Sequence, residues 1–295
     1  MFVSSIEEVS KFTRPIYTIT RNFNEKIVSP GAATLFFVNE EGVAITTKHV
    51  IELIRNRESI NNKYEKYKSE KNALGRNNKY NQRIKALDLA YNFKEGTIIQ
   101  LQEMFVGVTG EPSTRYRWIN HPKYDLSILI LEDFKNPMYQ SYARFLKDGS
   151  SLKQGSFLCR LGFPFPEFTN FRYNETLDNI EWTRSGQIES PIFPIEGMLT
   201  RHLISEGVIF GVELSTPGLR GQSGGPLFST DGIVCGMQAS TNHLHLGFDM
   251  KNFKYKINGR NTKVTNQPFM HVGHCIHVEI IKSFLSENKI KFYEN

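Results

Sequence analysis

Short runs of branched and aromatic residues, separated by polar turn residues, make up most of the chain. A first series comprises IYTIT (16–20), ATLFFV (33–38), GVAITT (42–47), TIIQLQEMFVGV (97–108) and DLSILILE (125–132). A second series comprises SFLCRLGF (156–163), EWTRSGQIES (181–190), GVIFGVEL (207–214), PLFS (226–229) and GIVCGMQAS (232–240). Runs of this length bounded by Gly, Pro, Asn and Asp are typical of antiparallel strands. The pattern predicts an all-β fold, built as a sandwich or as barrels.

The two ends of the chain predict helices. Ser4 and Ser5 each stand three residues before a glutamate, Glu7 and Glu8, which is the signature of a capping box. VEIIKSFLSEN (278–288) places its apolar residues on one helical stripe. We therefore expect helices over 1–14 and 279–290.

Two insertions interrupt the strand pattern. Residues 52–95 carry apolar residues at helical spacing on both sides of Gly75, which predicts a helical hairpin. This segment holds eleven basic and six acidic residues, so its excess of +5 nearly equals the net charge of +6 of the whole chain. Such runs usually face solvent, although a basic surface could also bind an acidic or regulatory protein; nucleic acid is disfavoured. The second insertion, 242–268, is polar and holds His243 and His245.

The composition bounds the class and the compartment. With 295 residues and 39% hydrophobic residues, the chain is long enough to bury a core. No apolar run approaches the length of a membrane span, and the first residues do not predict a signal peptide. Three cysteines are too few for a disulfide framework. We expect a cytoplasmic protein that does not contact a membrane.

The segment Gly221-Gln222-Ser223-Gly224-Gly225-Pro226 carries the most specific chemistry in the sequence. A nucleophilic serine needs a tight turn whose backbone N–H groups point at the oxygen that becomes negative during acyl transfer. We therefore expect the N–H groups of Gly221 and Ser223 to form an oxyanion hole. The same residues fit the G-x-S-x-G motif of the nucleophile elbow in α/β-hydrolases. That motif requires a helix after the serine, whereas PLFSTDGIVCGM predicts two strands, so the α/β-hydrolase interpretation is disfavoured.

A serine nucleophile also needs a general base and an acid that orients the base. The run 45–50 predicts a strand that ends in His49, and Asp125 opens an apolar strand. The chain order His, Asp, Ser differs from the orders found in subtilisin and in α/β-hydrolases. Asp88 also lies between His49 and Ser223, but no apolar strand follows it, and a triad requires a fixed, buried carboxylate. The sequence thus predicts a catalytic triad of His49, Asp125 and Ser223.

With these residues in place, the chain resembles the trypsin-like serine peptidases, and the HtrA/Deg protease domain more than the digestive enzymes. The resemblance covers most of 15–50 and 97–290. It is carried by GAATLFFVNEEGVAITTKHV (31–50), DLSILILE (125–132), QGSFLCRLGFPF (154–165), TRSGQIES (183–190), GQSGGPLFSTDGIVCGM (221–237) and HVGHCIHVEIIKSFL (271–285). Lys48 departs from the family pattern, because a small residue usually precedes the histidine. No PDZ domain is expected after the last helix.

This resemblance implies a chymotrypsin-like fold, with the active site in a cleft between two six-stranded antiparallel β-barrels. The expected order is an N-terminal helix (1–14), a first barrel (15–135) with the helical insertion 52–95, a second barrel (150–278) with the insertion 242–268, and a C-terminal helix (279–290). Together they would form one peptidase domain. The segment 183–190 would be a strand that faces the oxyanion hole.

The resemblance also implies where the side chain before the scissile bond, P1, would bind. The base of this S1 pocket would come from Pro217, and its wall from Gln238, Ala239, Ser240 and Thr241. Without an acid at the base, cleavage after Lys or Arg is disfavoured. Related enzymes that accept Glu or Gln often have a histidine where Gln238 stands, which disfavours that specificity as well. We expect a small or medium uncharged P1 residue. The predicted function is a serine endopeptidase that acts on protein or peptide substrates without a cofactor. The alternative is a catalytically idle scaffold of the same fold that binds protein or nucleic acid.

Other polar and sulfur-containing residues have simpler interpretations. His271, His274, Cys275 and His277 could suggest zinc, but strand alternation turns His274 away from the other three, and the paired ligand spacing of zinc sites is missing. We expect no metal site. Cys159 and Cys235 lie in apolar strands and are expected to be buried as small hydrophobic residues.

Overall fold

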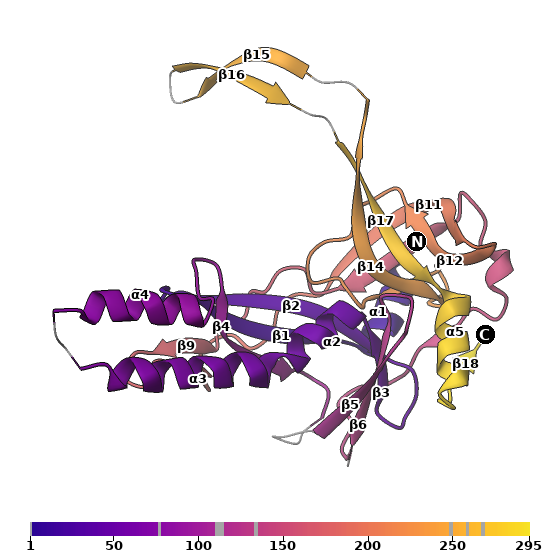
Figure 1. Ribbon diagram of the computed structural model, residues 1–295. Helices are drawn as coiled ribbons and strands as arrows, with labels where there is room; N and C mark the ends of the chain where they lie inside the picture. Colours follow the sequence, from indigo (N-terminus) through magenta and orange to yellow (C-terminus); the bar gives the residue numbers. More distant parts are fainter. Residues whose placement is uncertain are drawn as a thin grey trace.

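The first six strands form one antiparallel sheet in the order β4-β1-β2-β3-β6-β5 (Figure 1). The computed structural model describes residues 2–75, 78–109, 115–132, 135–247, 250–257, 260–266 and 269–295. The strands of this sheet are β1 (Thr13–Asn22), β2 (Val28–Phe37), β3 (Val43–Thr46), β4 (Ile98–Phe105), β5 (Arg115–Asn120) and β6 (Ser127–Glu132). The five apolar runs of the first series therefore fall on strands, as predicted. Only β5 was not anticipated, because its sequence RYRWIN is polar at alternate positions.

The second sheet has eight strands in the order β13-β8-β11-β12-β17-β14-β7-β18, and a further pairing joins β13 to β14. Its strands are β7 (Arg144–Phe145), β8 (Phe157–Gly162), β11 (Phe193–Ser205), β12 (Val208–Leu214), β13 (Pro226–Phe228), β14 (Val234–His245), β17 (Phe269–His277) and β18 (Tyr293–Glu294). The pairing of β13 with both β8 and β14 closes six of these strands into a ring. β7 pairs with β14, and β18 pairs with β7, in parallel. The sheet therefore differs from the purely antiparallel barrel that was expected.

The first sheet stays open, whereas a closed barrel was expected. No pairing joins β4 to β5 among the described residues. The reason lies at the edge of β4, where the side chain of Asn61 bonds both backbone groups of Leu101: its Nδ2 donates to the carbonyl and its Oδ1 accepts from the amide, each at 2.9 Å. A helix therefore covers the edge that a strand would need. Together the half-barrel and the second sheet still fit a mostly β, double-barrel fold.

The helices are α1 (Val3–Ser10), α2 (Lys48–Arg55), α3 (Arg57–Ala73), α4 (Tyr80–Ala90) and α5 (Val278–Glu287), with a 3₁₀ turn at Gly149–Ser151. The helical insertion and the closing helix are confirmed. α1 is shorter than expected, because β1 begins at Thr13. The predicted capping boxes are wrong, since the helix starts before Ser4 and the Ser5 hydroxyl donates to the Phe2 carbonyl at 2.9 Å. His49 does not end a strand either: β3 stops at Thr46, and His49 lies in the first turn of α2.

The segment between β8 and β11 leaves the second sheet. β9 (Phe171–Asn174) and β10 (Asn179–Trp182) form a separate two-stranded ribbon. Residues 183–190 are not a strand, in contrast to the prediction. Their backbone bonds singly to other groups, as in the Ser190 amide that donates to the Tyr17 hydroxyl at 2.8 Å and the Thr169 amide that donates to Gln187 at 2.8 Å. Such isolated bonds do not make a strand ladder.

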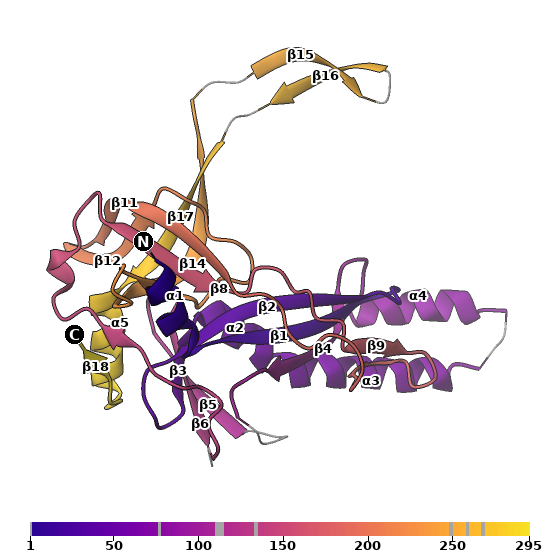
Figure 2. The same cartoon turned by 180° about the vertical axis from the view of Figure 1, so that it is seen from behind.

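The predicted insertion 242–268 continues the arms of β14 and β17. These strands pair as far as His245 and Phe269. Beyond them, β15 (Met250–Ile257) pairs with β16 (Arg260–Asn266) at the end of a ribbon that projects from the body (Figures 1 and 2).

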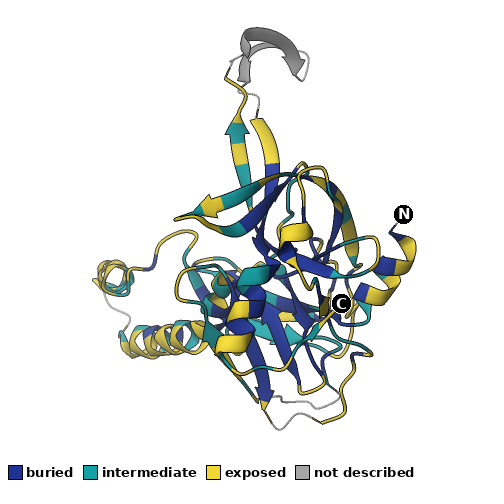
Figure 3. Cartoon of the chain, turned by 90° about the vertical axis from the view of Figure 1, so that its right-hand side faces the viewer, coloured by how far each residue is buried: buried dark blue, intermediate teal, exposed yellow. Residues whose placement is uncertain are grey.

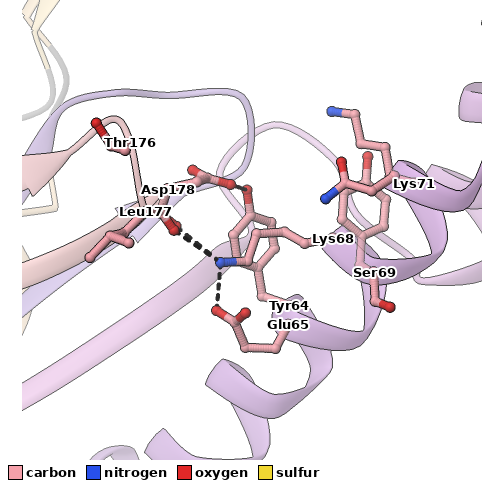
Figure 4. A pocket seen from close by; sticks show the side chains of 10 residues that line it. Tyr64, Glu65, Lys68, Ser69, Lys71, Thr176, Leu177 and Asp178 are labelled. Carbon is pink, nitrogen blue, oxygen red and sulfur yellow. Dashed lines mark hydrogen bonds and ion pairs between the residues drawn. The ribbon is translucent and has the colours of Figure 1, made fainter.

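The helical hairpin is fastened to the body rather than free in solvent. Tyr64 and Tyr67 of α3 are buried against Phe23, Phe93 and Ile99. The Tyr64 hydroxyl donates to Asp178 in the β9–β10 turn at 2.8 Å, and Lys68 Nζ donates to backbone carbonyls of the same turn (Figure 4). The hairpin thus holds the β9–β10 ribbon against β4. Its binding to an acidic partner stays a prediction.

The buried strands lie at the centre of the body, while the outer faces of α3 and α4 are exposed (Figure 3). One core cluster draws residues from both sheets, among them Phe36 and Ile45 of the first and Phe228, Met237 and Ile276 of the second. No helix in the described part of the chain is long and apolar enough to cross a membrane.

Candidate active site

The turn that holds Ser223 is packed too closely for side chains. Gly221 and Gly224 adopt φ values of +94° and +86°, which favour glycine. A Cβ atom on Gly221 would lie 2.3 Å from the Phe163 carbonyl oxygen, and one on Gly224 would lie 2.1 Å from that of Thr34. The glycines therefore let the turn rest directly on the backbone of both sheets.

Two threonines of the first sheet hold this turn. The Thr34 hydroxyl donates to the Gly221 carbonyl at 2.7 Å, and the Thr34 amide donates to the Ser223 carbonyl at 2.9 Å. The Thr46 hydroxyl donates to the Thr34 carbonyl at 2.8 Å. Because Thr46 ends β3 and α2 follows, these contacts tie the Ser223 turn to the segment that carries His49.

His49 and Asp125 are brought together, as the sequence predicted for the base and its acid. His49 Nδ1 lies 2.7 Å from Asp125 Oδ2, and the His49 amide donates to Asp125 Oδ1 at 3.0 Å. A carboxylate accepts hydrogen bonds, so this contact assigns the imidazole proton to Nδ1 and leaves Nε2 as an acceptor. The His49 side chain remains 52% exposed.

Asp125 is kept ionised by its partners. Burial raises the pKa of this carboxyl, but hydrogen bonds from the His49 ring, the His49 amide and the Lys48 amide outweigh burial and hold the pKa below its ordinary value. The amides belong to the first turn of α2, where the helix dipole also favours an anion. The carboxylate can thus orient the imidazole near neutral pH.

The third contact of a triad is not made. Ser223 is half-buried, and its hydroxyl makes no hydrogen bond to any residue that the structure describes. His49 Nε2 instead lies 3.5 Å from the Thr47 hydroxyl. Catalytic hydrogen bonds are often long before substrate binds.

The backbone around Ser223 leaves two N–H groups free. The amides of Gln222, Gly224 and Gly225 donate to carbonyls at 3.0, 2.9 and 2.8 Å. In contrast, the amides of Gly221 and Ser223, the predicted oxyanion hole, donate to no group in the described part of the chain. Two unpaired N–H groups on either side of one residue are what an oxyanion hole requires.

A cavity of 480 Å³ opens beside Ser223. All five residues predicted for the S1 pocket line it. The complete lining is Pro217, Gly218, Leu219, Arg220, Ser223, Gln238, Ala239, Ser240, Thr241, His243 and His271. These residues therefore lie beside the serine, while their role as an S1 pocket stays a prediction; the sequence did not indicate the contribution of the histidines.

The remaining candidates lie elsewhere. Asp88 accepts a hydrogen bond from Tyr67 at 2.7 Å inside the helical hairpin. His274 pairs with Glu213 at 3.2 Å, and His277 accepts the Glu279 amide at the start of α5. No group of three metal-ligating side chains occurs among the described residues.

All three cysteines are unpaired and buried, as expected for Cys159 and Cys235. Burial raises the pKa of each thiol to about 12. Such thiols stay protonated at neutral pH and are poor nucleophiles.

Sequence reasoning missed Thr34, Thr46 and Arg160. The threonines act through contacts between distant strands. Arg160 is fully buried below the cavity, and its side chain bonds Gln238 and Thr216. The only feature of the sequence that could have indicated Arg160 is the presence of a cation inside the apolar run SFLCRLGF.

No protein-family model and no curated protein matches the chain. Among solved structures, the chain is similar to an HtrA-type protease, AlgW, determined in a variant form with a tripeptide. The two chains are 11% identical with a TM-score of 0.46, and the match covers 97% of this chain and 63% of that one. The chain thus spans less than two thirds of the length of that protease.

Proposed function

We propose that the protein is a serine endopeptidase, with Ser223 as nucleophile, His49 as general base and Asp125 as the acid that orients it. The observation that carries the proposal is the bond between Asp125 and His49 Nδ1, because it leaves Nε2 able to accept the serine proton. The two unpaired amides beside Ser223 support it.

In the proposed reaction, the Ser223 hydroxyl adds to a peptide carbonyl while its proton passes to His49. The amides of Gly221 and Ser223 stabilise the negative oxygen. His49 then gives the proton to the leaving amine as the C–N bond breaks, which leaves an ester on Ser223. Water, deprotonated by His49, cleaves the ester and releases the carboxylic acid product. Overall one water is consumed per peptide bond.

A fluorophosphonate probe tests the nucleophile, because it reacts with activated serines. We expect it to label the wild-type protein at Ser223, as mapped by mass spectrometry, and not to label Ser223→Ala. Ser283→Ala, which changes an exposed serine on α5, is the matched control and should label normally.

Peptide-library cleavage by the same three proteins then tests the reaction. Loss of cleavage in Ser223→Ala alone supports the peptidase. A folded wild-type protein that neither reacts with the probe nor cleaves peptides would contradict the proposal and favour the idle scaffold.

A further inference from the structure

Arg160 of β8 is a buried cation without an anionic partner. Its side chain is 0% exposed, and no carboxylate lies within ion-pair distance among the described residues. Nη1 donates to Gln238 Oε1 at 2.8 Å, and Nη2 donates to the Thr216 carbonyl at 3.0 Å and to its hydroxyl at 2.6 Å. Nε has no acceptor. Of the residues that the structure describes, only neutral groups therefore solvate this guanidinium.

A buried charge of this kind is costly unless an opposite charge accompanies it. Burial lowers the pKa of Arg160. A guanidinium nevertheless stays protonated in proteins, so the positive charge persists. An anion close to it would gain far more in this interior than at the surface.

Gln238 connects Arg160 to the cavity. Because a guanidinium can only donate, its bond fixes Oε1 of Gln238 toward Arg160 and the amide nitrogen away from it. Nε2 donates one proton to the Ser240 carbonyl at 2.7 Å, and a second proton remains for another acceptor. Gly218 gives this nitrogen room, because a Cβ there would lie 2.2 Å from it. Gln238 is 2% exposed and lines the cavity.

The rest of the lining adds a second cation and two histidine rings. Arg220 is exposed at the cavity, and His243 faces His271 across the arms of β14 and β17 with their Nδ1 atoms 2.5 Å apart. No Asp or Glu lines this cavity among the described residues. The cavity beside Ser223 is therefore cationic and offers hydrogen-bond donors.

We propose that this cavity is an S1 pocket that selects an acidic P1 residue, with Gln238 donating to the substrate carboxylate and Arg160 supplying the charge behind it. Glutamate fits better than aspartate, because its longer side chain reaches the buried amide of Gln238. This inference rests on the proposed peptidase function. It replaces the expectation of an uncharged P1 residue, which took account of Pro217 and Gln238 but not of the buried Arg160, and it keeps the expectation that Lys and Arg are disfavoured.

Peptides that differ only at P1 test the charge preference. We expect kcat/KM for Glu to exceed that for the isosteric Gln by about tenfold or more, since the two differ mainly in charge, and no cleavage after Lys. Equal rates for Glu and Gln, or a preference for Ala, would overturn the inference.

Gln238→Glu tests the role of Arg160 without removing it. The new carboxylate still accepts from Arg160 but neutralises its charge and repels an acidic P1 side chain. We expect the preference for Glu over Gln to disappear, and an unchanged preference would refute the role of Arg160. Arg172→Gln, which removes an exposed cation on β9, is the control and should leave the ratio unchanged.

The probe also separates the two proposals. Labelling without an acidic preference refutes the pocket assignment alone. If the wild-type protein is not labelled, calorimetry on Ser223→Ala with acetylated peptides that end in Glu-amide or Gln-amide still tests the pocket. Tighter binding of the Glu peptide would support it, and equal binding would refute it.

Discussion

Thr34→Val isolates the contact between the first sheet and the Ser223 turn. The substitution keeps the shape of a side chain that is 0% exposed but removes the hydroxyl. Two buried groups lose their partner: the Gly221 carbonyl, to which the hydroxyl donates at 2.7 Å, and the Phe163 amide, from which it accepts at 3.2 Å.

The cost follows from these two groups. Leaving a buried polar group unpaired costs about 1.5 kcal/mol each, or about 3 kcal/mol together. The added methyl group returns about 0.8 kcal/mol through burial. We therefore expect the free energy of unfolding to fall by about 2 kcal/mol.

Urea denaturation followed by fluorescence measures this change. A single transition is expected, because one core cluster joins the two sheets. Thr20→Val is the matched control: its hydroxyl makes one exposed bond of 3.4 Å, so its effect should stay below about 0.5 kcal/mol. Labelling of Ser223 should also slow in Thr34→Val, because the turn loses an anchor. A stability of Thr34→Val within 0.5 kcal/mol of the wild type would refute the reasoning.

Three further predictions concern Asp125 in the candidate active site, Asp178 in the β9–β10 turn, and the helical hairpin. Asp125→Asn should lower kcat by about 10⁴-fold because it no longer holds the Nδ1–H tautomer of His49; a loss below tenfold in steady-state kinetics would contradict this role. Burial raises the pKa of the Asp178 carboxyl, but bonds from Tyr173, Tyr64 and Arg21 outweigh burial and leave the pKa below its ordinary value. The contribution of these bonds to the stability of the fold is therefore present above the ordinary carboxyl pKa and is lost as the pH falls through the pKa of the folded state. The stability gap between wild type and Asp178→Asn in urea should therefore narrow from pH 7 to pH 3, and a constant gap would count against it. Replacing 55–92 with a Gly-Ser linker should leave Ser223 labelling detectable but lower the urea midpoint, because Phe23 and Ile99 lose their cover; an unchanged midpoint would show that the hairpin does not brace the body.

Most of the strands and the chemistry of the Ser223 turn could be predicted from the amino-acid sequence. Alternating or continuous apolar runs report burial locally, so the strands around Ile16, Ile45 and Ile128 could be read from the chain. Gly221 and Gly224 beside Ser223 also report a local property, because their positive φ values favour glycine. Triad residues could be proposed from their order, and the structure does place Asp125 against His49.

The contacts between distant segments could not be predicted in the same way. Asn61 covers the edge of β4, and this keeps the first sheet open. In the sequence, Arg160 is a cation within an apolar strand, and nothing nearby in the chain indicates its partner. In the structure, Gln238 of β14 accepts a hydrogen bond from it. Both contacts join residues far apart in the chain, and no local periodicity encodes them. The strands could therefore be predicted, but the closure of the sheet and the charge beneath the cavity could not.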